Sequence, residues 1–274
     1  MTTLVNACAS TKDYAKFGQT GQAYAQAINK LLDATKKVSI DSSSEKMLVN
    51  RPNTREERKI LYTNTNTNDT EWLDLLSQMQ AHTNLLAKYF ERLQALATSD
   101  APDRAQAETE NIVENLSMIG DKIRSNGLVN GKVIPQIVDI AVKARIRSSL
   151  KAELKARKAT IQKKLDTQDK VLALITQELN RQLKDLQEIR EERLLYKPYV
   201  TSSQINNPDD FVNNRGHILA LTTMIPELEQ ATKVSGELKS SFLDLIDGKL
   251  TPNRVNVLLS DIDSLLQVAQ NLKG

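Results

Sequence analysis

The amino-acid sequence predicts an all-α protein, built as an elongated antiparallel helical bundle with coiled-coil character. The first observation is compositional: glycine (9) and proline (7) are scarce in 274 residues, and aromatic residues make up only 4%. Strands are normally enriched in aromatic and β-branched residues and bounded by turn residues. The second observation is a stretch, 135–197, that contains no glycine and has apolar residues at helical spacing.

The stretch 135–197 is expected to form one long helix on which the bundle is organised. Pro135 suits a first helical turn, and Pro198 is expected to end the helix after Lys197. An unbroken helix of this length would be roughly 95 Å long, so other helices must lie along it. Its heptad-like seam is mostly apolar, with polar positions between, and consists of Leu154, Lys158, Ile161, Leu165, Gln168, Leu172, Ile175, Leu179, Gln182, Leu186, Ile189 and Arg193.

Upstream, the first helix is predicted over 13–49, where apolar residues recur at helical spacing. Gly18 and Gly21 near its start would let another backbone approach closely. The sequence Arg51-Pro52-Asn53 is expected to end this helix.

The next predicted helix begins after a polar connection over 64–68 (NTNTN), with Asp69 or Thr70 as its N-cap. The charged segment 55–62 before that connection is expected to form one or two turns at most. A third helix is predicted from Pro102 to a glycine cap at Gly127.

Downstream of Pro198, a helix is predicted over 209–247, with Pro226 expected to kink or split it. Gly248 is expected to cap it, and Thr251-Pro252 provides an N-cap and first-turn proline for a last helix to about residue 272. The predicted organisation is therefore a flexible tail over 1–12 and a single elongated bundle over 13–274, with short connections between antiparallel neighbours.

Charge is unevenly distributed along the chain. The net charge is only +3, but one segment of the predicted long helix, 143–164, is strongly basic. Its candidate anion-binding residues are Lys143, Arg145, Arg147, Lys151, Lys155, Arg157, Lys158, Lys163 and Lys164, against Glu153 alone. One interpretation is a solvated helix whose acidic partners lie on neighbouring helices. The other is an anionic partner: phospholipid headgroups, an envelope polymer or nucleic acid.

A short motif lies near the start of the sequence. Leu4-Val5-Asn6-Ala7-Cys8 resembles the lipobox of bacterial lipoproteins, in which a small residue precedes the lipidated cysteine. The resemblance implies lipidation at Cys8, a location in the bacterial cell envelope or periplasm, and an apolar signal segment upstream of Met1. The alternative is an incidental cysteine in a flexible tail.

No arrangement of residues predicts catalysis, a metal site or a cofactor. Neither His82 nor His217 has an acidic residue three positions before it, as the histidines of di-iron bundles do. His82 falls on the apolar face of its helix and is expected to be a hydrogen-bonded packing residue. The chain is therefore predicted not to be an enzyme.

The function predicted first is that of a structural or interaction protein, tethered to the envelope through Cys8 and binding a partner protein or a second copy along its helix faces. One alternative is a basic coiled-coil protein that binds nucleic acid or anionic phospholipid through 143–164. Another is a soluble component of a helical pore-forming toxin, with Val133–Val142 as its membrane-inserting segment. No segment approaches the ~20 apolar residues of a transmembrane helix.

Overall fold

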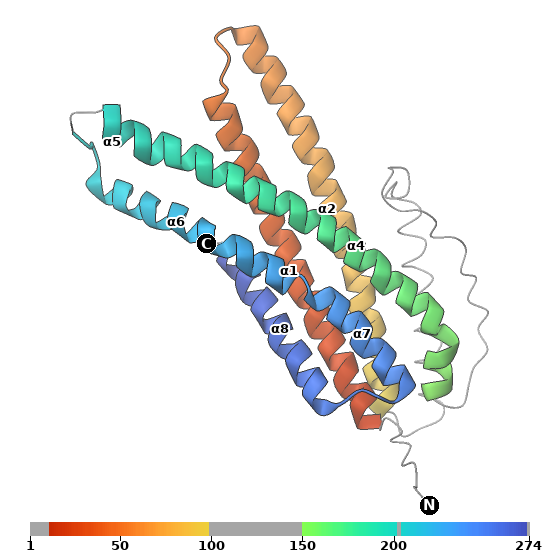
Figure 1. Ribbon diagram of the computed structural model, residues 1–274. Coiled ribbons are helices and arrows are strands. Elements are labelled where there is room, and N and C mark those ends of the chain that lie inside the picture. The colour runs from red at the N-terminus through yellow and green to blue at the C-terminus, as the bar shows by residue number, and fades with distance from the viewer. Residues whose placement is uncertain (1–10, 99–149, 202–203, 273–274) are drawn as a thin grey trace, which may run out of the picture.

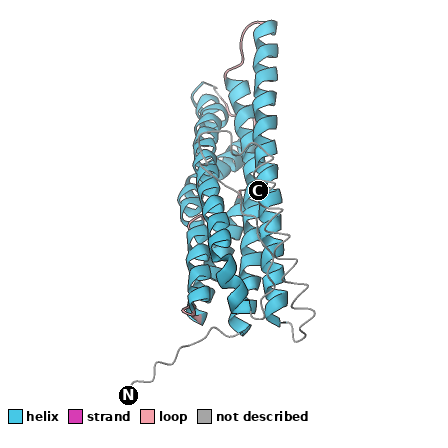
Figure 2. Ribbon diagram, turned by 90° about the vertical axis from the view of Figure 1, so that its right-hand side faces the viewer, coloured by secondary structure: helices cyan, strands magenta, loops and turns pink. Residues whose placement is uncertain are grey.

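A computed structural model of the chain describes residues 11–98, 150–201 and 204–272. All regular structure in these ranges is helical, which confirms the predicted all-α bundle (Figures 1 and 2). A π-helical turn, Glu191–Tyr196, joins α4 (Leu150–Arg190) to α5 (Lys197–Thr201). The helices are α1 (Thr11–Val49), α2 (Arg55–Thr98), α4 (Leu150–Arg190), α5 (Lys197–Thr201), α6 (Pro208–Ala231), α7 (Val234–Asp247) and α8 (Pro252–Asn271).

Helix α1 lies at the centre of the described bundle. It pairs with α2 as an antiparallel hairpin and also contacts α4, α7 and α8 (Figure 1). Phe17, Leu31 and Ala34 of α1 are completely buried. The predicted organising helix, α4, contacts α1, α6 and α7. The bundle therefore has two organising helices, α1 and α4, which cross each other.

The predicted seam of α4 is buried inside the chain. Most of its positions are less than one-tenth exposed: Leu154, Ile161, Leu165, Gln168, Leu172, Ile175, Leu179, Gln182 and Leu186. Lys158, Ile189 and Arg193 are half-buried. Because α1, α6 and α7 pack against α4, most of the seam closes within one chain over the described residues 154–193.

The predicted end of the long helix at Pro198 is wrong, because the helix continues through Pro198 to Thr201. A proline inside a helix lacks the N–H donor and its ring crowds the carbonyl four residues back. The π-helical turn immediately before it widens the helix, and the Lys197 N–H bonds to Glu192 O, five residues back. The proline ring is thereby accommodated. The part of the predicted helix over 135–149 lies outside the described residues.

The predicted polar connection over 64–68 is also wrong. Helix α2 runs through it without a break and begins at Arg55, one residue after its N-cap, Thr54. The Thr54 hydroxyl accepts a hydrogen bond from the Glu57 N–H at 3.3 Å and donates one to the Glu57 carboxylate at 2.7 Å. Asn and Thr have modest helix propensity, but propensity is a weak prior, and the Thr67 and Thr70 hydroxyls donate to the Thr63 and Asn66 carbonyl oxygens one turn back.

The break in the predicted 209–247 helix lies at 232–233 and not at Pro226, which lies inside α6. Leu228 and Val234 are both buried. They are six residues apart, so one continuous helix would point them to different sides. The break lets both reach the core. Downstream, Gly248 has a φ of 71° and caps α7, and the Thr251 side chain caps α8, as predicted.

Gly21 determines how closely α1 and α2 approach each other. A Cβ at this position would lie 2.3 Å from Cγ of Phe90, so no other residue fits without a shift of the phenyl ring. At Gly18 a Cβ would lie 2.8 Å from the Phe90 carbonyl oxygen. Phe90 also meets Phe17 edge-to-face, with 5.9 Å between ring centroids. The predicted close approach of another backbone is confirmed at Gly18, whereas at Gly21 the neighbour is the Phe90 ring.

The bundle forks at one end. Figure 1 shows the α1–α2 hairpin ending at the top and the α5–α6 hairpin ending at the upper left, while the first residue of α1 lies at the opposite end. We call residues 48–62 the first prong and residues 191–201 together with 204–215 the second prong. The predicted helix over 102–127 lies outside the described residues, as do residues 1–10 of the tail predicted over 1–12; Thr11 and Lys12 belong to α1.

His82 of α2 is buried, but the predicted hydrogen bond is wrong. The side chain is 3% exposed, and neither ring nitrogen has a hydrogen-bond partner among the described residues. Burial, followed by the charge of Lys164, lowers the pKa of His82 to about 4. Between that value and the ordinary pKa of about 6.5, the unfolded chain binds a proton that the folded chain does not.

We expect this histidine to make the fold sensitive to acid. Its contribution to stability is lost as the pH falls from about 6.5 through 4, by up to about 3 kcal/mol. Urea denaturation of the wild type and of His82→Leu at pH 7 and pH 4 measures it, and the variant should lose less free energy of unfolding between the two pH values. His217→Gln, which alters the exposed histidine, is the control. Equal losses in wild type and His82→Leu would contradict the assignment.

Candidate functional site

Polar side chains gather where α4 crosses α1. On α1 they are Ser39, Glu45 and Lys46; Ser39 and Lys46, seven residues apart, share one side of the helix, and Glu45 lies on the adjacent side. On α4 they are Glu178, Arg181, Gln182, Asp185 and Arg190, and Arg193 follows in the π-helical turn. We call this set the polar seam. It forms because the two helices bring together residues about 140 positions apart in sequence.

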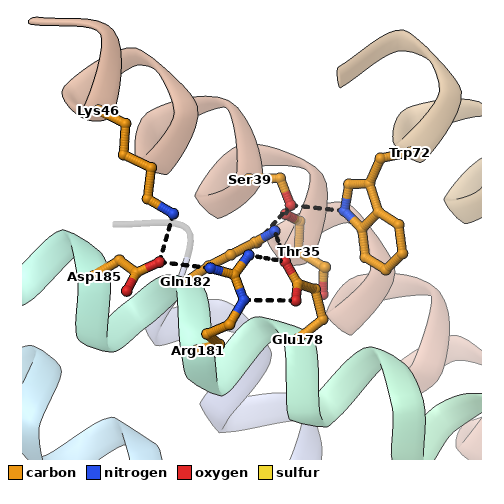
Figure 3. A network of polar contacts seen from close by, with 8 residues as sticks. All are labelled: Thr35, Ser39, Lys46, Trp72, Glu178, Arg181, Gln182 and Asp185. Carbon is orange, nitrogen blue, oxygen red and sulfur yellow. Dashed lines mark hydrogen bonds and ion pairs between the residues drawn. The ribbon is translucent and has the colours of Figure 1, made fainter. Parts of the chain in front are cut away.

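The α2 side of the polar seam is a connected network of hydrogen bonds (Figure 3). The Ser39 hydroxyl donates to the side-chain oxygen Oε1 of Gln182 at 2.7 Å and accepts a hydrogen bond from the Trp72 indole N–H at 2.9 Å. Arg181 donates to Glu178 and to Asp185, and Lys46 donates to the same Asp185 carboxylate. Three helices are thereby joined through side chains, with Ser39 as their common point.

The other side of the polar seam is centred on Glu45, whose side chain is only 8% exposed. Arg193 binds its two carboxylate oxygens at 2.9 and 2.8 Å, and Arg190 binds one of them at 3.1 Å. Burial acts to raise the pKa of Glu45, but the hydrogen bonds and charges of both arginines outweigh burial and lower it. The carboxylate is therefore held ionised.

A groove opens beside Glu45, between α1, α4, α6 and the end of α8. Its volume is about 930 Å³. Its apolar floor comes from Val38, Leu186, Ile218, Leu221, Met224 and Leu272. Its charged lining is balanced, with three basic side chains (Lys37, Arg190, Arg193) and three acidic ones (Asp41, Glu45, Glu227). His217 also lines it. We call this hollow the α1–α6 groove.

A smaller hollow of about 270 Å³ lies on the α2 side of the seam. Ser39 and Lys46 of α1, Asp69 and Trp72 of α2, and Arg181 of α4 line it. Most of the polar groups that line this hollow already bond to one another. Ser43, which also lines it, donates to Asp69 at 2.8 Å. The polar groups of this hollow therefore act mainly to fasten α2 to α1 and α4.

The predicted anion-binding residues fall in different surroundings. Lys143, Arg145 and Arg147 lie outside the described residues, and Lys151 and Arg157 lie on the first turns of α4. Lys155 is exposed, Lys163 is half-buried, and Lys164 is 3% exposed. Lys158 pairs with Asp247 of α7 at 3.1 Å, the kind of acidic partner expected of a solvated helix. Anion binding by 143–164 stays a prediction.

The lipidation candidate Cys8 and the proposed membrane-inserting segment 133–142 both lie outside the described residues. Within the ranges that the structure describes, no helix is both long and apolar enough to span a bilayer. Nor do three or more potential metal-ligating side chains meet anywhere in those ranges.

Comparison of the chain with protein-family models, characterised proteins and solved structures finds no match. The groove and the polar seam are therefore interpreted from their own geometry.

Sequence reasoning missed the pairing of Glu45 with Arg190 and Arg193. The signal available was the polar interruption of the α4 seam at Gln182 and Arg193, because a polar residue at a seam position needs a buried partner. The sequence does not show which residue of α1 lies opposite.

Replacing Glu45 by Gln should destabilise the fold by about 1–3 kcal/mol. Removing one partner of a fully buried ion pair costs about 3–5 kcal/mol, and the partial exposure of Arg190 (29%) and Arg193 (38%) reduces that figure. Urea denaturation at pH 7 provides the measurement. The difference from wild type should vanish at low pH, since a carboxylate with a lowered pKa contributes stability only while it is ionised.

Asp41→Asn is the matched control, because Asp41 reaches Arg190 only at 3.5 Å and is 37% exposed. We expect it to change the stability by less than about 0.5 kcal/mol. An effect of Glu45→Gln no larger than that of Asp41→Asn would contradict the central place given to Glu45.

Proposed function

We propose that this chain is a helical interaction protein that binds an amphipathic helix of a partner protein in the α1–α6 groove. The observation that carries this proposal is the shape and lining of the groove. It follows α6 from Asn214 to Glu227, a distance of about 20 Å. A helix of about thirteen residues has that length, and grooves between helices commonly bind the apolar face of such a segment.

The lining indicates the chemistry of the partner helix. The apolar floor favours an apolar stripe at helical spacing, as in other helix-in-groove complexes. Equal numbers of acidic and basic side chains favour a partner helix of mixed charge over a polyanion. Glu45 occupies Arg190 and Arg193, so neither arginine is the natural binding point for a phosphate.

A tether at Cys8 would suit this geometry. Cys8 precedes the start of α1 at Thr11 by three residues, and α1 reaches the groove at Lys37 to Glu45. At 1.5 Å per residue, α1 would hold the groove roughly 40–50 Å from its own first turn. We propose that the chain presents its groove at this distance from a membrane of the bacterial envelope.

Photo-crosslinking tests the groove. A photoreactive amino acid at Leu221 or at Met224, both on the groove floor, should crosslink the same partner in the native host, through a peptide with an amphipathic helical pattern. The matched control is Val257, an exposed position (51%) on α8 that does not line the groove. Ala220→Trp, which fills the groove, should abolish both crosslinks. Crosslinks equally strong from Val257, or unaffected by Ala220→Trp, would contradict the proposal.

The tether has a separate test. The intact mass of the protein from its native host should correspond to a chain that begins at Cys8 and carries acyl groups, and Cys8→Ala should lose them. An unacylated mass that retains the residues before Cys8 would exclude lipidation. The proposal of helix binding in the groove would then stand without a membrane tether.

A further inference from the structure

The first prong is an exposed helical tip with a basic character. No residue of 48–62 is buried, and Leu48, Val49, Ile60 and Tyr62 are about half exposed or more. The prong carries four basic residues (Arg51, Arg55, Arg58 and Lys59) and two acidic ones (Glu56 and Glu57). Arg58 donates to the Pro52 and Asn53 carbonyl oxygens, which carry no charge.

The second prong is also an exposed tip, but it is acidic. Tyr196, Tyr199 and Val200 are 56–68% exposed and lie three and four residues apart, on one side of the helix. Tyr199 stacks on Phe211 of α6, with ring centroids 6.1 Å apart, so the apolar surface continues across the hairpin. Val212, 66% exposed, extends it.

The charges of the second prong are opposite to those of the first. The second prong carries four acidic residues (Glu191, Glu192, Asp209 and Asp210) and three basic ones (Arg193, Lys197 and Arg215), of which Arg193 is ion-paired with Glu45 of α1. Lys197 lies 3.6 Å from Glu192 and offsets part of that residue's charge. Apolar side chains concentrated on an exposed tip typically mark an interaction surface.

The two prongs cannot cover each other within one molecule, because the hairpins diverge (Figure 1). We propose that they pair between two copies of this chain, the first prong of each copy contacting the second prong of the other. Opposite charges favour this pairing, and like charges disfavour contact between two first prongs or two second prongs.

A two-fold axis perpendicular to the plane of the fork forms both contacts at once. Each copy then presents its fork to the other, head to head, and each prong finds its complement. An isologous contact of this kind closes on itself, so it gives a dimer and not a filament. Two small tips bury less surface than a standard interface, so the dimer belongs to the weak class, sensitive to salt.

Sedimentation of the full chain at increasing concentration tests the pairing. We expect a monomer–dimer equilibrium that shifts toward monomer as salt is added. Arg55→Glu with Lys59→Glu should weaken the dimer at least about tenfold, and so should Glu191→Lys with Asp209→Lys, because each creates like-charge contacts. An equimolar mixture of these two variants should form heterodimers, because one contact then has both wild-type charges and the other has both charges exchanged. The quadruple variant should dimerise like the wild type, because both of its contacts have their charges exchanged.

Lys30→Glu with Lys88→Glu is the matched control, since both lysines are exposed on the α1–α2 hairpin outside the first prong. It should leave the dissociation constant unchanged, and helical circular dichroism should show every variant folded. A chain that stays monomeric at roughly 100 μM in low salt would overturn the proposal. A dimer that neither double variant weakens, or whose loss the quadruple variant fails to restore, would also overturn it.

Discussion

The fold depends on the burial of α1 against the helices around it. Phe17 of α1 meets Phe90 of α2 and Phe242 of α7, with ring centroids 5.9 and 6.1 Å apart, so three helices share one aromatic cluster. Gly21 makes this cluster possible, because the Phe90 ring occupies the space of the missing side chain. Apolar burial of this kind is the largest favourable term in folding. It fixes α1 and α2 as one rigid hairpin, against which α4, α7 and α8 are placed.

The polar seam has a different role. Its hydrogen bonds and ion pairs determine how α1 and α4 are aligned more than they add to the free energy of unfolding. Gross attraction in a buried ion pair is largely offset by desolvation of the two charges. Ser39 and Glu45 nevertheless have partners on α4 at defined distances, which apolar contacts alone would not select. We infer that the seam fixes the register at which α4 crosses α1. The crossing in turn separates α4 from the α1–α2 hairpin and gives the bundle both its groove and its fork.

The groove and the prongs use different physical chemistry. The groove combines an apolar floor with charges that are already balanced inside the chain, so its selectivity rests on shape and apolar spacing. The prongs carry apolar side chains with unbalanced charge of opposite sign, so charge governs their choice of partner. The two surfaces are lined by different segments, apart from Arg193, Leu194 and Asn214 at the base of the second prong. Binding at one therefore leaves most of the other accessible.

The sequence by itself determined the helical class, the α4 seam, the closely packed glycines and the caps at Gly248 and Thr251. These features follow from residues that lie close together in the sequence, so a short segment is enough to predict each of them. Only the tertiary structure decided that α2 runs through 64–68, that a π-helical turn carries the chain past Pro198, and that Glu45 lies between Arg190 and Arg193. That last contact joins residues 145 and 148 positions apart. Its partners become neighbours only when α4 crosses α1, and no local pattern contains that crossing.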